Sequence, residues 1–165
     1  MHSHTFTALE VIPPSRQDFI DYLINEFNSL PRMEPRFMFN ASTAEYFYQN
    51  IGPNFDILNS YYVYKIFHSI HDFVDMRVND EYERMSKLLY DWKSESKMEL
   101  ADDCLALLCK LRHKSIKLDL KTTVNQHICI KQLTKNEIIQ QTEWHYYQIN
   151  HQLTLAAASI LCDAM

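Results

Sequence analysis

The sequence predicts an all-α protein, a single-domain helical array or bundle of about seven helices. One residue of the 165 is glycine, Gly52, whereas about 11 or 12 glycines are usual at this length. Because the turns of β-hairpins favour glycine or asparagine, so few glycines disfavour a strand-rich fold. In addition, apolar side chains recur along most of the chain at the spacing of amphipathic helices.

Length and composition are those of one domain with its own core. Hydrophobic residues make up 47% of the chain and charged residues 22%, which is typical of a folded protein rather than a disordered one. Pro13 and Pro14 close an irregular lead-in at residues 1–14. Residues 15–165 are predicted to form a single helical domain.

Capping and stop signals mark the first two helices. Ser15, with an acidic residue three positions later, predicts a helix start, and Pro31 ends that stretch. Ser42 and Glu45 have the spacing of a capping box and predict a second, shorter helix. Gly52 and the proline after it stop this second helix.

Apolar stripes predict three further helices in the middle of the chain. A long helix begins at Asp56, and Asn79 and Asp80 cap the next one. The polar residues 93–97 predict a break in the helical pattern. Residues 100–111 then place leucines and a cysteine on one side of a helix.

The last third of the chain is less uniform. Residues 116–133 contain alternating and β-branched residues, so a short strand is one alternative there. We favour the other alternative, a loop followed by a short helix at residues 124–130. Thr134 and Glu137 have capping-box spacing and predict a helix with its inner face within residues 139–153. The apolar residues 155–165 predict a final helix.

Composition also argues against several classes of function. The net charge is −5 and no run of Lys or Arg occurs, which disfavours nucleic-acid binding, and one glycine leaves no glycine-rich phosphate loop. No apolar run approaches the roughly 20 residues of a membrane span, and residues 1–10 lack the pattern of a signal peptide. We therefore expect an intracellular protein of the cytoplasm or nucleus, without membrane contact, whose four cysteines are reduced, buried thiols.

One group of side chains has the spacing of metal ligands. His68, His71 and Asp72 stand at i, i+3 and i+4, so they share a face of the predicted long helix. This group resembles part of the metal site of histidine–aspartate phosphohydrolases, which also needs ligands from other helices. The alternative is an ordinary polar helix face. We favour that alternative, and we expect no metal, no cofactor and no catalytic residues.

Clustered aromatic residues indicate instead a surface for binding another protein. Aromatic side chains gather at residues 45–48, 61–64 and 144–147. A domain of this size leaves some of these rings near the surface, where tyrosine and tryptophan often dominate interface energetics. The alternative is that the rings fill the core with their hydroxyl groups reaching water.

Two segments share motifs with a known family. Asp91, Trp92 and Glu95 have the spacing of a D-W-L-x-E motif, and a T-K-x-x-I-I pattern follows later in the chain. With these motifs, residues 87–111 and 133–160 resemble a cyclin box, which is a unit of five helices. The resemblance implies a cyclin-like helical array that binds a protein kinase.

Together, the aromatic clusters and the resemblance predict a non-catalytic regulatory or protein-binding module. Glu143 lies one residue from the position of a kinase-contacting glutamate in the fifth helix of that family. Two alternatives stay open: a metal-dependent phosphohydrolase of the histidine–aspartate type, and a homo-oligomeric structural protein with aromatic residues at a self-interface. The residues predicted to bind the partner are Trp92, Glu95, Glu143, Trp144 and Tyr147.

Overall fold

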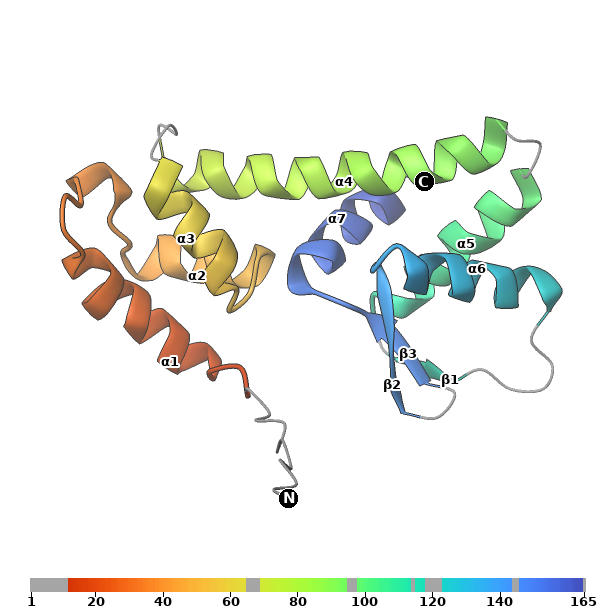
Figure 1. Cartoon of the computed structure of the whole chain (residues 1–165), viewed down its shortest axis with the longest axis horizontal. Helices are drawn as coiled ribbons and strands as arrows, with labels where there is room; N and C mark the ends of the chain where they lie inside the picture. Colours follow the sequence, from red (N-terminus) through yellow and green to blue (C-terminus); the bar gives the residue numbers. More distant parts are fainter. Residues whose placement is uncertain are drawn as a thin grey trace, which may run out of the picture.

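Helices make up most of the protein. The computed structural model describes residues 12–64, 69–94, 98–113, 115–117, 123–143 and 146–164. Its elements in chain order are α1 (Arg16–Asp21), the π-helical turn η1 (Tyr22–Glu26), the 3-10 turns η2 (Phe27–Ser29) and η3 (Pro35–Phe37), α2 (Ala41–Asn50), α3 (Phe55–Tyr64), α4 (Ile70–Ser94), α5 (Met98–Leu111), β1 (Ile116–Lys117), α6 (Val124–Lys135), β2 (Ile139–Glu143), β3 (Tyr146–Ile149) and α7 (Gln152–Asp163). Seven α-helices within the described ranges confirm the predicted all-α class (Figure 1).

Side-chain caps start the first two helices. The Ser15 hydroxyl accepts a hydrogen bond from the Asp18 N–H at 3.2 Å, as the sequence predicts for the start of α1. The predicted start of α2 is wrong by two residues, because Asn40 rather than Ser42 is the N-cap. Asn40 and Thr43 exchange side-chain and backbone hydrogen bonds in a capping box.

Helix α4 is one continuous element of 25 residues, which corresponds to about 37 Å. The sequence predicted a break at Asn79 and Asp80, and this prediction is wrong. Both side chains are exposed in the helix interior, so their polarity marks a solvent-facing surface rather than a helix start. The helix predicted to begin at Asp56 corresponds to α3, which ends at Tyr64, and α4 begins separately at Ile70.

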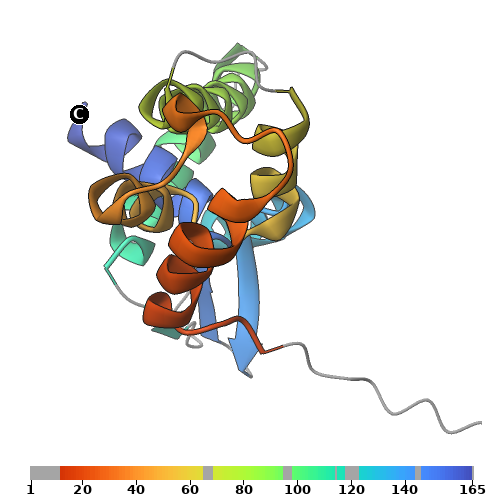
Figure 2. The ribbon, with the colours of Figure 1, turned by 90° about the vertical axis from the view of Figure 1, so that its left-hand side faces the viewer.

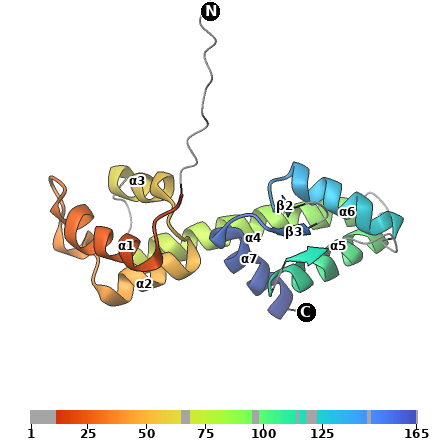
Figure 3. The same ribbon diagram turned by 90° about the horizontal axis from the view of Figure 1, so that it is seen from below.

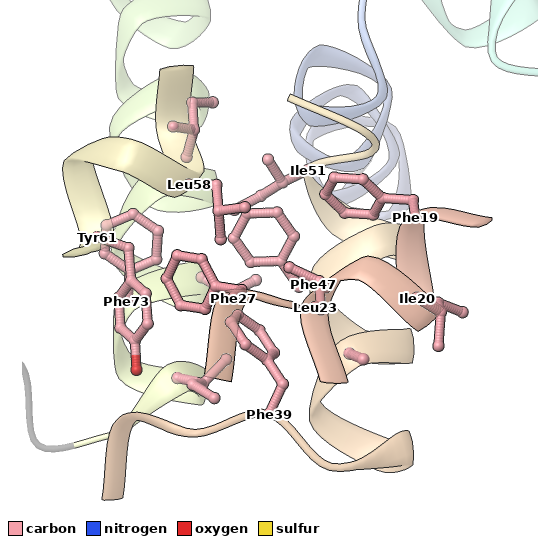
Figure 4. Close-up of a cluster of buried hydrophobic side chains, with 14 of the residues drawn as sticks. Phe19, Ile20, Leu23, Phe27, Phe39, Phe47, Ile51, Leu58, Tyr61 and Phe73 are labelled. Atoms are coloured by element: carbon pink, nitrogen blue, oxygen red, sulfur yellow. The ribbon is translucent and has the colours of Figure 1, made fainter. Parts of the chain in front are cut away.

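An aromatic core lies against the first half of α4. Phenylalanine and tyrosine rings from α1, α2, α3 and α4 point toward one another there (Figure 4). Tyr61 is 1% exposed, lies 5.0 Å from Phe73 between ring centroids, and donates a hydrogen bond to the Phe37 carbonyl at 3.0 Å. We call this core the N-terminal cluster, and its largest buried members include Phe19, Leu23, Phe37, Phe47, Tyr61 and Phe73.

A second core, the C-terminal cluster, lies among the end of α4, α5, α6, β2 and α7. The expectation of reduced thiols is wrong, because all four cysteines form disulfides. Cys104 pairs with Cys129 and Cys109 pairs with Cys162, with Cα–Cα distances of 5.3 and 5.7 Å. Helix α5 is thereby tied to α6 and to α7. The bonded cysteines are 25 and 53 residues apart, so the local spacing of cysteines in the sequence does not predict the pairing.

The C-terminal part also contains a three-stranded antiparallel sheet in the order β1-β3-β2. Ile139 of β2 lies opposite Ile149 of β3, so the helix predicted across this segment is wrong. Thr134 belongs to the last turn of α6, and Glu137 takes a φ of 59°, which ends the helix. This polar pair therefore marks a helix end instead of a start. For residues 116–133 the sequence left a short strand and a short helix as alternatives. The structure has both, the strand β1 first and then the helix α6.

Helix α7 joins the two clusters. It lies beside the middle of α4, between α2 and α5 (Figures 1 and 3). Leu153 packs against the N-terminal cluster, whereas Ala157 and Ala158 belong to the C-terminal cluster. The buried Thr154 hydroxyl donates a hydrogen bond to Glu81 of α4 at 3.2 Å. In the view along α4, α1, α2 and α3 lie on one side of that helix (Figure 2).

Candidate functional site: a groove along α7

The predicted partner-binding residues lie in different environments. Trp92 is 7% exposed and belongs to the C-terminal cluster, so its ring is part of the core. Tyr147 of β3 is half-buried and packs against the same cluster, whereas Glu143 is exposed at the end of β2. Glu95 and Trp144 lie outside the described residues. The three described residues therefore do not form one exposed surface.

The histidine–aspartate group is only partly within the described residues. His68 falls outside them, and His71 and Asp72 are exposed in the first turn of α4. The His71 ring stacks on Tyr46 of α2, with 4.3 Å between centroids. Within the described ranges, no group of three His, Cys, Asp or Glu side chains is placed to hold a metal ion.

A surface groove runs along α7 where the two clusters meet. One part, between α2, α4 and α7, has a volume of about 580 Å³ and is lined by Tyr46, Asn50, Asp75, Val78, Asn79, Tyr82 and Ile160. The adjoining part, between α2, α7 and the end of α5, has a volume of about 450 Å³ and is lined by Gln49, Asn50, Arg112, His113, Gln152, Leu155, Ala156, Ser159, Ile160 and Asp163. Both parts share Asn50 and Ile160, and we call them together the interlobe groove.

Cross-links between helices hold the walls of the groove in place. Arg112, just after α5, forms an ion pair with Asp163 of α7 at 2.7 Å, close to the second disulfide. The Gln152 side chain donates a hydrogen bond to the Gln49 carbonyl of α2 at 2.7 Å. A Cβ at Gly52 would lie 3.0 Å from the Gln152 Cβ, and Gly52 has a φ of 79°. Glycine at this position therefore allows α7 to start close to α2.

A hydrogen bond between α2 and α4 defines one side of the groove. The Tyr46 hydroxyl donates this bond to the Asp75 carboxylate. The bond, together with desolvation of the ring, raises the pKa of Tyr46 to about 12. The protonated phenol is the form that donates the hydrogen bond to Asp75, and the bond joins α2 to α4 at the groove.

Apolar and aromatic side chains remain accessible inside the groove. Ile160 of α7 is 49% exposed, and Tyr46 and Tyr82 line the same hollow from α2 and α4. Val78 of α4 is buried in the wall. Tyrosine and aliphatic side chains surrounded by polar groups are typical of the centre of a protein interface.

The α4 edge of the groove is acidic. Asp75 lines the groove, and Asp72 lies one turn earlier on the same helix face. Glu83 lies two turns later on that face and accepts a hydrogen bond from the Asn79 side chain at 3.3 Å. A partner that approaches this edge meets three carboxylates on one side of α4.

Only part of the groove is predictable from the sequence. Tyr46 belongs to the aromatic cluster at residues 45–48, one of the three clusters proposed as interface residues. Ile160 was not singled out, although it is a large apolar residue that lies off the buried stripe of α7. The contact between α2 and α4 at the groove depends on tertiary packing, which the local spacing of residues does not predict.

Comparisons with models of known protein families, with curated proteins and with solved structures found no match. Within the described part of the chain, no helix combines the length and the apolarity needed to cross a membrane. The geometry of the interlobe groove therefore carries the functional inference.

Proposed function

We propose that this chain is a non-catalytic protein-binding module that holds a segment of its partner in the interlobe groove. The observation that carries the proposal is the accessible Ile160 beside Tyr46 and Tyr82, within walls that are cross-linked by hydrogen bonds, an ion pair and a disulfide. A surface built on fixed helices loses little conformational entropy on binding. Such a surface supports binding through a few well-packed side chains.

The chemistry of the groove indicates the chemistry of its partner. Ile160 favours an apolar side chain, and the carboxylates of Asp72, Asp75 and Glu83 favour Lys or Arg on one flank of it. The proposed partner segment is therefore apolar with flanking basic residues. The cyclin-box resemblance implies a protein kinase as the partner, but the chemistry of the groove alone carries this proposal and does not require a kinase.

The disulfides support a proposal about the compartment in which the protein works. Disulfides persist in oxidising compartments and are kept reduced in the cytosol. Because all four cysteines are paired, we propose an oxidising environment in place of the cytoplasm or nucleus.

The test compares wild type with two matched variants of the full chain on a solid support. Ile160→Asp places a charge in the groove, and Val63→Asp places the same charge on α3, where Val63 is 61% exposed. From an extract of the natural source, at least one protein should be retained equally by wild type and Val63→Asp. Its retention by Ile160→Asp should fall about tenfold or more, because an unpaired charge would be buried at the interface.

Circular dichroism establishes that all three forms are folded to the same extent. If wild type retains no protein, or if the two variants retain the same proteins in the same amounts, the groove is not the binding surface.

A further inference from the structure

Helix α6 carries an exposed ridge that combines apolar and basic side chains. Val124 and Ile128 are 75% and 40% exposed, and Lys131 and Lys135 are exposed on the turns that follow. The spacing i, i+4, i+7 and i+11 places all four on one helix face. We call these four residues the α6 ridge.

The opposite face of α6 anchors the ridge to the protein. Cys129 and Leu133 are 0% exposed in the C-terminal cluster, and Cys129 is bonded to Cys104 of α5. A capping box between Thr123 and Gln126 fixes the first turn. The ridge is therefore presented by a fixed helix and does not contribute to the core.

Basic charge is concentrated in the part of the chain that contains the ridge. Residues 110–135 hold seven Lys and Arg and one acidic residue, whereas the rest of the chain holds nine Lys and Arg and 20 Asp and Glu. One of the seven, Arg112, lines the groove itself, where its charge is paired with Asp163. Neither Lys131 nor Lys135 forms an ion pair with another described residue. The net charge of −5 conceals this separation. A molecule with two oppositely charged surfaces attracts copies of itself.

The interlobe groove has the features that the α6 ridge would need in a binding surface. Ile160 offers apolar contact area and Asp75 lines the groove. The exposed carboxylates of Asp72 and Glu83 add negative charge on the same face of α4, next to the groove lining. The ridge in turn has the composition proposed above for the partner segment, with apolar residues flanked by basic ones.

The geometry points to a second copy of this chain as the occupant of the interlobe groove. In this arrangement, Val124 and Ile128 of one copy contact Ile160 of the other. The ridge lysines lie along the acidic edge of α4 in the other copy. The inference rests on the proposed function, since it uses the same groove.

The contact joins two different surfaces, so each copy contributes one ridge and offers one groove. Two copies form a closed dimer when both contacts form together, and otherwise the contact repeats into a longer assembly. The charge pairs lie near the protein surface. Association should therefore weaken as the ionic strength rises.

The experiment is light scattering on the oxidised full chain across a range of concentrations at low salt. The ridge variant carries Lys131→Glu and Lys135→Glu, and the groove variant carries Asp72→Lys and Glu83→Lys. Asp75 is left unchanged because it holds Tyr46. Wild type should associate, and each variant alone should associate about tenfold more weakly or not at all, because like charges then face each other.

Mixing the two variants should restore association through both contacts. The acidic ridge of the first variant meets the basic groove edge of the second, and the unchanged ridge of the second meets the unchanged groove of the first. Circular dichroism establishes that both variants are folded.

Three results would overturn the inference: wild type that stays monomeric at every concentration, a variant that associates as wild type does, and a mixture that stays monomeric when each variant alone is monomeric. The proposed function survives any of these results if, in the extract experiment, wild type retains a protein other than this chain and Ile160→Asp does not retain it. If that experiment also fails, the groove is not a binding site at all.

Discussion

Trp92 and Tyr90 lie in opposite environments, although they are two positions apart on α4. The exposed fraction is 7% for Trp92 and 69% for Tyr90. The cyclin-box motif predicts a partner-binding role for Trp92, whereas the structure places its ring in the C-terminal cluster. Burial of one side of α4 thus separates two aromatic residues that look equivalent in the sequence.

Replacing Trp92 should therefore affect stability first. Trp92→Ala should lower the free energy of unfolding by about 3–5 kcal/mol, because it removes a large buried ring and leaves a cavity. Tyr90→Ala is the matched control on the same helix and should change it by no more than about 0.5 kcal/mol. Urea unfolding measures both, and a near-neutral Trp92→Ala would show that the ring is not a core element.

Tyr46 leads to a prediction about pH. Its pKa is about 12 in the folded protein and about 10 in the unfolded chain, so folding favours the protonated phenol. The stabilisation is complete below about pH 10 and is lost as the pH rises through about 12. An NMR titration of the Tyr46 ring in Asp75→Asn should give a lower pKa than in wild type, because the carboxylate is gone. An unchanged pKa would contradict the role assigned to Asp75.

Among the elements, α5 holds the C-terminal part together through its two disulfides. Because the bonded cysteines are 25 and 53 residues apart, replacing each pair by serine should lower the free energy of unfolding by about 3.5 and about 4 kcal/mol. Urea unfolding of the two double variants measures these losses. Peptide mapping without reductant should recover Cys104 with Cys129 and Cys109 with Cys162. The protein can also be isolated from its natural source, denatured without reductant and treated with an alkylating reagent. Alkylation of all four cysteines would contradict both the pairing and the oxidising compartment.

The turn between α6 and β2 leads to a prediction about backbone conformation. Glu137 has a φ of 59°, a left-handed conformation that is unfavourable for residues with a Cβ. Glu137→Gly should raise the free energy of unfolding by about 1 kcal/mol, since glycine adopts this conformation without a steric penalty. Glu137→Ala keeps the Cβ and should give no such gain. Thermal unfolding compares the two, and equal effects would rule out backbone strain as the cause.

How far the sequence predicts an element depends on whether its signals are local. Caps and apolar stripes are local, and they correctly predicted the start of α1 and the buried face of α5. The continuity of α4 was missed because polar residues on a solvent-facing surface resemble helix caps. The β2–β3 hairpin was missed because its apolar residues at positions 139 and 149 also fit a helical spacing. Strand pairing and disulfide pairing depend on segments that are distant in sequence.

At the scale of the whole molecule, α4 and α7 connect two hydrophobic clusters that would otherwise be separate. Helix α7 contributes to both, and its buried Thr154 is hydrogen-bonded to α4. The chain should therefore unfold in one cooperative transition. Hydrogen exchange of peptides from each cluster, followed through a urea series, should give one common midpoint. Two separate midpoints would show that the clusters are independent units.

The binding surface is also a property of the whole molecule. The interlobe groove exists because α2, α4 and α7 meet where the two clusters join. Of the aromatic side chains that line it, only Tyr46 belongs to an aromatic cluster that the sequence predicts at an interface. The concentration of basic residues around α6 is visible in the sequence. Its significance depends on the exposure of Val124 and Ile128 beside Lys131 and Lys135.

Site-specific photo-crosslinking tests the central claim, that the interlobe groove binds a protein, most directly. A benzophenone amino acid at position 160 reports contact in the groove, and the same group at position 63 serves as the exposed control. We predict strong adducts from position 160 and few from position 63. In the purified protein, adducts from position 160 should map to residues 124–135 of a second copy. Adducts from position 160 no stronger than those from position 63, in the purified protein and in an extract of the natural source, would contradict the claim.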